Sequence, residues 1–230
     1  MNPARAAIDY LLGGPTIGGV DEARWRSWSA LPAPPLAVPH GRMRYVVVAV
    51  EAVRHALRHD RLVSIGAVGV RRGQLDLADC FSAVLRQRRI VDAASQSRGG
   101  SAPLGAVEPK AAMLDFLDYL GKAPLVAFGA GHERPILERA MKSILGMPFR
   151  HTWLDLAALL PALFPHAPCT ARDEWLVHAG IAPAVASDSA GEAFVTAQLF
   201  LVALDASIRA GLVNAAQLIA TQRDRRPEHA

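Results

Sequence analysis

The chain has 230 residues, of which 51% are hydrophobic and 20% charged, a balance typical of a folded globular protein rather than a disordered one. Its 25 lysines and arginines exceed its 21 acidic residues, so the formal charge of +4 permits a polyanionic partner but does not demonstrate one. The two cysteines, Cys80 and Cys169, exclude a four-cysteine zinc site. Uninterrupted apolar runs are shorter than a membrane span needs, so we expect a cytoplasmic protein without a membrane partner.

Residues 1–43 are expected to form an N-terminal extension that lies on the core. Two short helical patterns over 4–12 and 21–29 are joined by GGPTIGG, and the Pro-rich stretch LPAPPLAVPH follows them. The main domain is predicted over 44–222, and a polar tail over 223–230.

Three consecutive strands are predicted at the start of the main domain. RYVVVAVEAV begins at Arg44, RLVSIGAVGV begins at Arg61, and an alternating segment covers 74–87. Arg72 and Gly73 are a tight-turn signal between the second and third strands, which predicts a hairpin.

The rest of the chain is predicted to alternate between strand and helix. We expect a flexible loop over 88–108, a helix over 109–120, a buried strand over 123–131 and an amphipathic helix over 133–145, followed by helices at about 153–163, 171–179, 188–210 and 214–222. This order predicts one α/β domain with a mixed sheet of about five strands, three of them an antiparallel meander, flanked by helices.

Four stretches of the main domain carry a family resemblance. They read AVEAVR at 49–54, LVSIGAV at 62–68, AFGAGHERPIL at 127–137 and SDSAGE at 187–192. In this order they resemble the 3′-5′ exonucleases of the DEDDh type, typified by the epsilon proofreading subunit of bacterial DNA polymerase III. The resemblance runs from about 44 to 212 and implies the ribonuclease-H-like fold, a mixed five-stranded sheet flanked by helices.

The resemblance also implies a catalytic pattern, which this sequence alters. The family holds two divalent cations with four carboxylates and uses a histidine as general base. Ala49 stands where the family has its first aspartate, and Glu51 keeps the glutamate that follows. Glu133 replaces the third acid, Ser187 the histidine and Glu192 the last aspartate. Alanine cannot bind a cation, serine is a poor base at neutral pH, and each Asp-to-Glu exchange lengthens a side chain by one methylene.

These exchanges leave three interpretations of function open, and with them the question of whether the chain is an enzyme. The first is a degenerate exonuclease-family domain that binds nucleotides or single-stranded nucleic acid, with absent or weak metal-dependent cleavage. The second is an active 3′-5′ exonuclease in which Glu51, Glu133 and Glu192, helped by Asp188, converge on Mg²⁺ or Mn²⁺. The third is a non-catalytic module whose partner is another protein.

A basic cluster follows the retained glutamate. Arg54 and Arg58 are the predicted phosphate-binding residues, because guanidinium groups suit phosphate oxygens. Arg54 would either neutralise Glu51 or hold a phosphate that metals no longer hold. The alternative is a solvated loop without a ligand.

Several of these acids also fit structural roles. Glu192 completes a capping-box pattern that starts at Ser189, and Glu133 lies in a first helical turn, where the macrodipole favours negative charge. Asp155 and Asp173 end similar patterns and are interpreted as helix starts rather than catalytic acids. The tryptophans are expected to be packing anchors: Trp25, Trp28, Trp153 and Trp175.

Overall fold

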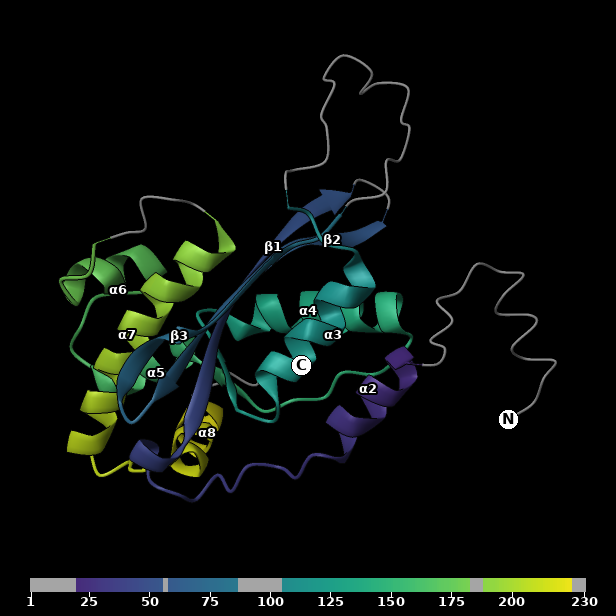
Figure 1. Cartoon of the computed structure of the whole chain (residues 1–230). Coiled ribbons are helices and arrows are strands. Elements are labelled where there is room, and N and C mark those ends of the chain that lie inside the picture. The colour runs from purple at the N-terminus through teal and green to yellow at the C-terminus, as the bar shows by residue number, and fades with distance from the viewer. Residues whose placement is uncertain (1–19, 56–57, 87–104, 183–187, 225–230) are drawn as a thin grey trace, which may run out of the picture.

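The computed structural model describes residues 20–55, 58–86, 105–182 and 188–224 and contains a five-stranded mixed sheet in the order β3-β2-β1-β4-β5 (Figure 1). The strands are β1 (Arg44–His55), β2 (Arg58–Arg71), β3 (Gln74–Val84), β4 (Leu125–Ala127) and β5 (Trp153–Asp155). The first three form an antiparallel meander, whereas β4 and β5 run parallel to β1. The predicted mixed sheet and its meander are confirmed.

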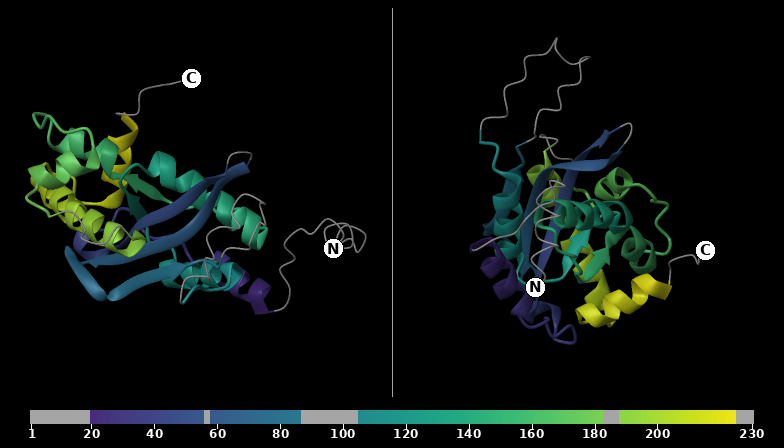
Figure 2. Two further views of the ribbon diagram at one scale, coloured as in Figure 1. Left: turned by 90° about the horizontal axis from the view of Figure 1, so that it is seen from above. Right: turned by 90° about the vertical axis from the view of Figure 1, so that its right-hand side faces the viewer.

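Helices cover both faces of the sheet (Figure 2). The first face carries α2 (Val20–Ala30), α3 (Pro109–Leu120) and α4 (Ala130–Leu145). The second face carries α5 (Leu156–Leu163), α6 (Arg172–His178), α7 (Ser189–Arg209) and α8 (Ala215–Asp224). A single turn of 3₁₀ helix, η1 (His40–Arg42), leads into β1.

The central strand β1 contributes side chains to two hydrophobic cores. Val46 and Val48 pack in the core beneath α3 and α4, while Tyr45, Val47 and Ala49 pack in the core beneath α5 and α7. A strand that is buried on both faces needs a continuous apolar run, which the sequence supplies. Position 49 is therefore a core position, and Ala49 is only 8% exposed.

The β2–β3 hairpin turns through two residues with left-handed backbone. Arg72 has φ 53° and Gly73 has φ 70°, and Arg71 pairs with Gln74 on either side of them. This is the two-residue turn whose twist matches that of the flanking strands. The hairpin predicted from Arg72 and Gly73 is confirmed.

Several element boundaries differ from the sequence predictions, and the strand expected over 123–131 is confined to Leu125–Ala127. The helix expected from about 153 begins at Leu156, because Trp153–Asp155 forms β5 and pairs with β4. Three residues are too few for a strand periodicity to show. The helix expected from 133 begins at Ala130, after Gly129 in left-handed conformation with φ 83°. The helix predicted over 4–12 lies outside the described residues. The same holds for residues 88–104 of the loop predicted over 88–108.

Helix α7 packs closely against β2. By length and composition it is the one described helix that could cross a membrane, a test that core helices also pass, and more than half of its apolar window is buried. A Cβ added to Gly66 would lie 2.1 Å from the carbonyl oxygen of Ser189. Gly66 pairs with Ala49 across the sheet, so the first turn of α7 lies over the position of the first family acid.

The tryptophans anchor the packing, as predicted. Trp28, Trp153 and Trp175 are buried, and Trp25 packs against the first core. Trp28 also donates a hydrogen bond from Nε1 to the carbonyl oxygen of Gly121 at 2.7 Å, which ties α2 to the end of α3.

Candidate functional site

The candidate site lies where the parallel strands β1, β4 and β5 end, which we call the carboxyl edge of the sheet. Glu51 lies toward the end of β1, Glu133 in the first turn of α4, and Glu192 in the first turn of α7. Asp155 is the last residue of β5. Because connections that follow parallel strands open at one edge, residues far apart in the sequence meet there.

Ala49 and Glu51 occupy the two positions of β1 where the family pattern has its first two metal-binding acids. The methyl group of Ala49 is part of the second core and offers no donor atom. Glu51 is exposed, and its Oε2 accepts a hydrogen bond from Ser64 Oγ at 3.0 Å. Ser64 stands opposite Glu51 in the β1–β2 register, so this carboxylate is held by its own sheet.

Glu133 is the most perturbed acid of the site. Its Oε2 atom is buried and has no hydrogen-bond partner among the described residues. The pKa of Glu133 is raised from 4.5 to about 8, mainly by burial and also by the negative charges of Asp155 and Glu192, while the positive charge of Arg172 opposes the shift. At neutral pH the Glu133 side chain is therefore mostly a protonated acid.

Arg172 pairs with the last acid of the family pattern. It is the first residue of α6, and its Nη1 donates to Glu192 Oε2. Its Nη2 also lies 3.3 Å from Asp173 Oδ1, a mostly exposed partner. A guanidinium keeps its charge at any ordinary pH, so Glu192 has a permanent internal counter-ion.

Asp155 links β5 to the start of two helices. Its Oδ1 accepts from the backbone N–H of Gly129 at 2.9 Å and of Ala157 at 3.0 Å. Asp155 lies at a helix start, as predicted, but it is the N-cap of α5 itself and not the acid that ends a capping box begun at Thr152. The bond to Gly129, the N-cap of α4, also explains why the charge of Asp155 acts on Glu133.

The other two cap predictions are shifted by one residue. The N-cap of α7 is Asp188, which accepts from Gly191 N at 2.7 Å, so Glu192 does not close a capping box from Ser189. At α6 the reciprocal acid is Glu174 and not Asp173, with its Oε2 accepting from Thr170 N and Ala171 N. In each helix the N-cap therefore lies one residue away from the N-cap that the sequence spacing predicted.

The structure thus brings together part of the predicted set. Glu133 and Glu192 lie close enough to interact electrostatically, together with Asp155 and Arg172. Nowhere in the described ranges do three His, Cys, Asp or Glu side chains gather as a metal-binding group, so the expected convergence with Glu51 is not seen there.

Three predicted residues are not placed by their side chains. Ser187 lies outside the described residues. Arg54 belongs to β1 and Arg58 to β2, but their side chains are outside the described part. Their assignment to phosphate binding stays a prediction.

Arg172 was missed by reasoning from the sequence. The stretch around it was interpreted only as a helix start, and its partner Glu192 lies 20 positions further on. One signal was present in the sequence, because a cation in the first turn of a helix opposes the macrodipole and needs a partner elsewhere.

The donor set does not fit two divalent cations of the kind that the family resemblance implies. Magnesium prefers oxygen ligands in octahedral geometry, and a two-metal site needs several carboxylates around both ions. Ala49 supplies no oxygen, Glu192 is paired with Arg172, and Glu133 is largely protonated at neutral pH. The unpartnered Oε2 of Glu133 is the one feature that a cation would satisfy.

Solved nuclease structures share this fold. Cell-death related nuclease 4 (CRN-4) superimposes with a TM-score of 0.58 at 11% identity, covering 76% of this chain and 68% of that chain. E. coli exonuclease I in complex with a dT13 oligonucleotide gives 0.58 at 12% identity, covering 78% and 46%. Exonuclease X in complex with 5′ overhanging duplex DNA gives 0.53 at 15% identity, covering 77% and 99%.

These likenesses define the class of fold. The chain has the ribonuclease-H-like fold of the DEDDh 3′-5′ exonucleases, a mixed five-stranded sheet flanked by helices, and the resemblance predicted from the sequence is confirmed at that level. It spans just under half the length of exonuclease I. No protein-family model matches the sequence, and no match is found among curated proteins.

Proposed function

We propose that this chain is a 3′-5′ exonuclease-like domain that binds single-stranded nucleic acid or nucleotides, with absent or weak metal-dependent cleavage. The observation that carries the proposal is the ion pair between Arg172 and Glu192. An internal guanidinium holds the acid that the family pattern would offer to a metal. Ala49 removes the first ligand of that pattern altogether.

The energetics of the ion pair favour this conclusion. A divalent cation that used Glu192 would have to separate the carboxylate from Arg172 and then lie beside the displaced guanidinium. Leaving one member of a partly buried pair without its partner is costly, and the like charges would repel each other.

The ligand class is supported by the structural neighbours. Exonuclease I is in complex with a dT13 oligonucleotide, and exonuclease X with 5′ overhanging duplex DNA. A domain of this fold can bind a nucleic-acid strand even when it lacks the full set of carboxylates that would hold two metal ions.

The alternative function is an active exonuclease that uses Glu51, Glu133 and Glu192 with Mg²⁺ or Mn²⁺. The observation in its favour is the buried, unpartnered Oε2 of Glu133, because a cation beside it would offset the cost of burial. Binding of this kind would require both Glu133 to lose its proton and Glu192 to leave Arg172.

The deciding experiment compares binding and cleavage on the same substrates. Single-stranded DNA and RNA oligonucleotides, labelled at the 5′ end, are incubated with the full chain in excess Mg²⁺ or Mn²⁺, and binding is followed by fluorescence anisotropy at low salt. The proposal predicts salt-sensitive binding without shortening of the strands. Glu51→Ala tests the site, and Glu138→Ala is the matched control, because Glu138 is a carboxylate of α4 paired with Arg134.

Each outcome separates the interpretations. Shortening that disappears in Glu51→Ala and persists in Glu138→Ala overturns the proposal in favour of the active enzyme. Shortening that survives in Glu51→Ala indicates a contaminating nuclease. A lack of binding to either strand at low salt would leave the fold as a protein-interaction module.

A further inference from the structure

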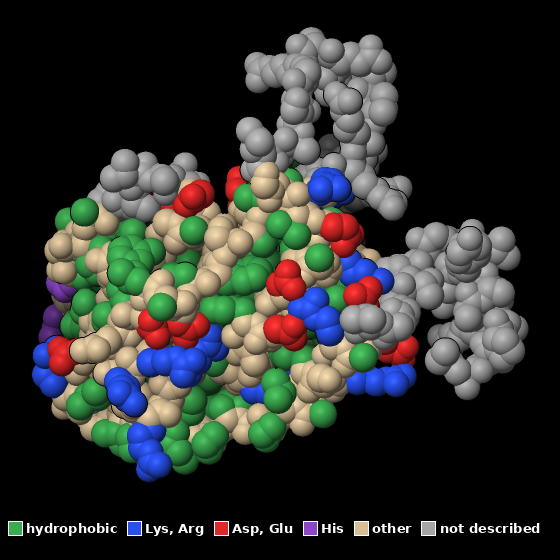
Figure 3. All heavy atoms as spheres, viewed as in Figure 1, with side chains coloured by type: hydrophobic (Ala, Val, Ile, Leu, Met, Phe, Trp, Pro, Cys, Tyr) green, Lys and Arg blue, Asp and Glu red, His purple; other side chains and the backbone are tan. Residues whose placement is uncertain are grey.

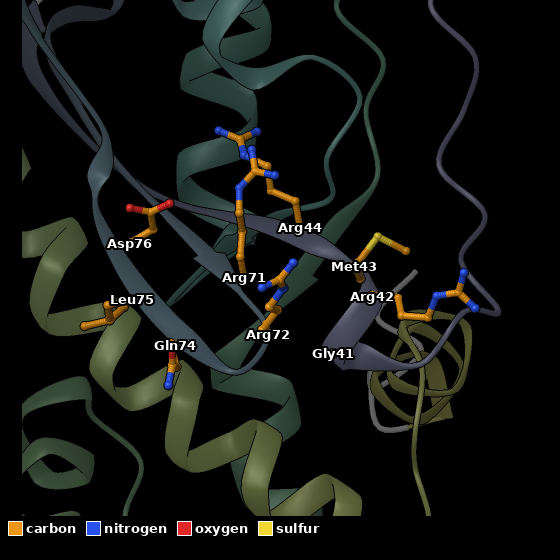
Figure 4. Close-up of a pocket in the computed structure, with 9 residues that line it drawn as sticks. All are labelled: Gly41, Arg42, Met43, Arg44, Arg71, Arg72, Gln74, Leu75 and Asp76. Atoms are coloured by element: carbon orange, nitrogen blue, oxygen red, sulfur yellow. The ribbon is translucent and has the colours of Figure 1, made fainter.

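A basic pocket lies at the edge of the sheet opposite the candidate site. It has a volume of about 700 Å³ and is lined by the residues that precede and begin β1 and by the β2–β3 turn (Figure 4). Glu51 lies seven positions after Arg44 along β1, which at about 3.3 Å per residue is roughly 23 Å. Because β1, β4 and β5 begin on this side, we call it the amino edge.

Two further pockets continue the hollow along the amino edge. One of about 480 Å³ shares Arg42, Arg44 and Arg71 with the first pocket and reaches Lys122. The next, of about 380 Å³, shares Lys122 and adds Arg150. We call the three pockets together the basic track. Its described lining carries two carboxylates, Asp76 and Asp79, and six cations: Arg42, Arg44, Arg71, Arg72, Lys122 and Arg150.

Within the track, the guanidinium of Arg44 is already paired with groups of the protein. Its Nε and Nη2 each donate to the Asp79 carboxylate at 2.7 Å, and its Nη1 donates to Leu120 O at 3.1 Å. Arg71 Nε donates to the same carboxylate at 3.0 Å while 54% of its side chain remains exposed. One carboxylate therefore serves two guanidinium groups, and positive charge is left over on the solvent side.

Arg72, Arg42 and Arg150 carry further uncompensated charge. All three are exposed, and within the described ranges none of their side chains has a hydrogen-bond or ion-pair partner. The side chain of Arg72 lies beside those of Arg71 and Arg44, whereas Arg42 points away beyond Met43 (Figure 4). Lys and Arg side chains gather on the surface over η1 and the β2–β3 hairpin (Figure 3).

The backbone at Arg72 is unusual for an arginine. Its φ of 53° is the left-handed conformation that Gly, Asn and Asp tolerate, and for other residues it costs about 1 kcal/mol. An arginine at this turn position carries that cost where asparagine would avoid it. Outliers of this kind point to a use for the side chain.

From these observations we infer that the basic track binds the phosphodiester backbone of single-stranded nucleic acid, as a second contact region distinct from the carboxyl edge. The inference rests on the proposed nucleic-acid binding and deepens it, because the described acids of the carboxyl edge outnumber Arg172 and would repel a polyanion. A continuous row of cations suits a linear polyanion better than a single anion. Arginine is also well matched to phosphate oxygens.

The lining predicts how such binding depends on salt and sequence. Tyr119 is the one Phe, Tyr or Trp among the described lining residues, and the guanidinium of Arg44 covers its ring at 4.9 Å. Bases therefore lack a free ring to stack on there. Binding through the backbone alone is expected to be insensitive to sequence and to weaken steeply with salt.

The experiment uses the full chain and a fluorescein-labelled oligo(dT), with anisotropy measured over a series of salt concentrations. The test variant is Arg71→Gln/Arg72→Asn, in which asparagine suits the left-handed turn and Asp79 keeps its pairing with Arg44. The matched control is Arg209→Gln/Arg223→Gln, which removes two exposed charges from α7 and α8.

We expect the test variant to bind several-fold more weakly at low salt. The slope of log K against log salt should fall in magnitude by about 1.4, since each single-strand phosphate contact contributes about 0.7. The control should change neither quantity. An unchanged slope in the test variant, with wild-type binding intact, would contradict the inference that the basic track binds the nucleic acid. It would not contradict the proposed function. Failure of the wild-type chain to bind would overturn both.

Competitors identify the ligand chemistry. Unlabelled oligo(dT) should displace the probe at far lower phosphate concentration than thymidine monophosphate or inorganic phosphate. Equal potency per phosphate would mean a site for single anions rather than a track. Equal displacement by poly-glutamate would contradict the assignment to nucleic acid and would indicate an acidic protein as the partner.

Discussion

Burial dominates the chemistry of Glu133, whereas pairing dominates that of Glu192. The two acids lie close enough to interact, yet one has an unpartnered buried oxygen and a pKa of about 8, and the other has a permanent guanidinium partner. Two glutamates that look equivalent in the sequence therefore have different surroundings and different partners. The difference comes from Arg172, which donates a hydrogen bond to Glu192 but acts on Glu133 only through a longer-range electrostatic interaction.

Replacing Glu133 by glutamine should change how stability depends on pH. The folded protein keeps a proton on Glu133 up to about pH 8, whereas the unfolded chain releases it near 4.5. The contribution of Glu133 is therefore fully present below about pH 4.5 and is lost as the pH rises through 8. Each unit of pKa corresponds to about 1.4 kcal/mol, so the difference between 4.5 and about 8 predicts that Glu133→Gln is more stable than wild type above pH 8 by up to roughly 5 kcal/mol.

Urea denaturation at a series of pH values measures this effect. Glu138→Gln serves as the control, because Glu138 lies on the same helix and pairs with Arg134 near the surface. Parallel pH profiles of wild type and Glu133→Gln would show that Glu133 has an ordinary pKa.

Residue patterns in the sequence predicted the acids of the site but not their partners. Glu51, Glu133 and Glu192 could be identified because motif order and spacing are local properties of the chain. The pair between Arg172 and Glu192 is set by the docking of α6 against α7, which no local pattern records. Likewise, the burial of Glu133 depends on packing around α4 and not on its neighbours in sequence.

The strands and helices were more predictable than the site. The long runs of β1 and β2 and the Arg72–Gly73 turn gave the meander, and Pro109 at the first position of α3 marked a helix start. The three-residue strands β4 and β5 carry too little periodicity to bound them. The pairing of β4 with β1, and of β5 with β4, is fixed by burial in the finished sheet.

Helix α7 owes its position to a glycine in the neighbouring strand. Gly66→Ala would place a methyl group against the Ser189 carbonyl, and a backbone atom cannot rotate away as a side-chain end can. We expect a loss of about 3 kcal/mol or more in the free energy of unfolding. Gly41→Ala is the control, because nothing lies within 4 Å of its added methyl group.

Thermal and urea denaturation of the two variants, side by side, test this packing. Gly41→Ala should stay within about 0.5 kcal/mol of wild type. Equal stabilities of Gly66→Ala and Gly41→Ala would mean that the first turn of α7 does not press on β2.

The described part of the molecule separates its charges between the two edges of one sheet. Acids and Arg172 occupy the carboxyl edge, where a family exonuclease would hold its metals, while arginines and Lys122 line the amino edge. The modest net charge of +4 hides this division. The chemistry of the two edges is the basis of the proposal that this domain binds strands more readily than it cleaves them.

Mn²⁺ binding measured by isothermal titration calorimetry tests this account most directly. The wild-type chain is predicted to bind Mn²⁺ weakly, and Ala49→Asp/Arg172→Ala, which restores an acid and frees Glu192, should bind it about tenfold more tightly or better. Tight, saturable Mn²⁺ binding by the wild-type chain that disappears in Glu51→Ala would contradict the replacement of the metals by Arg172.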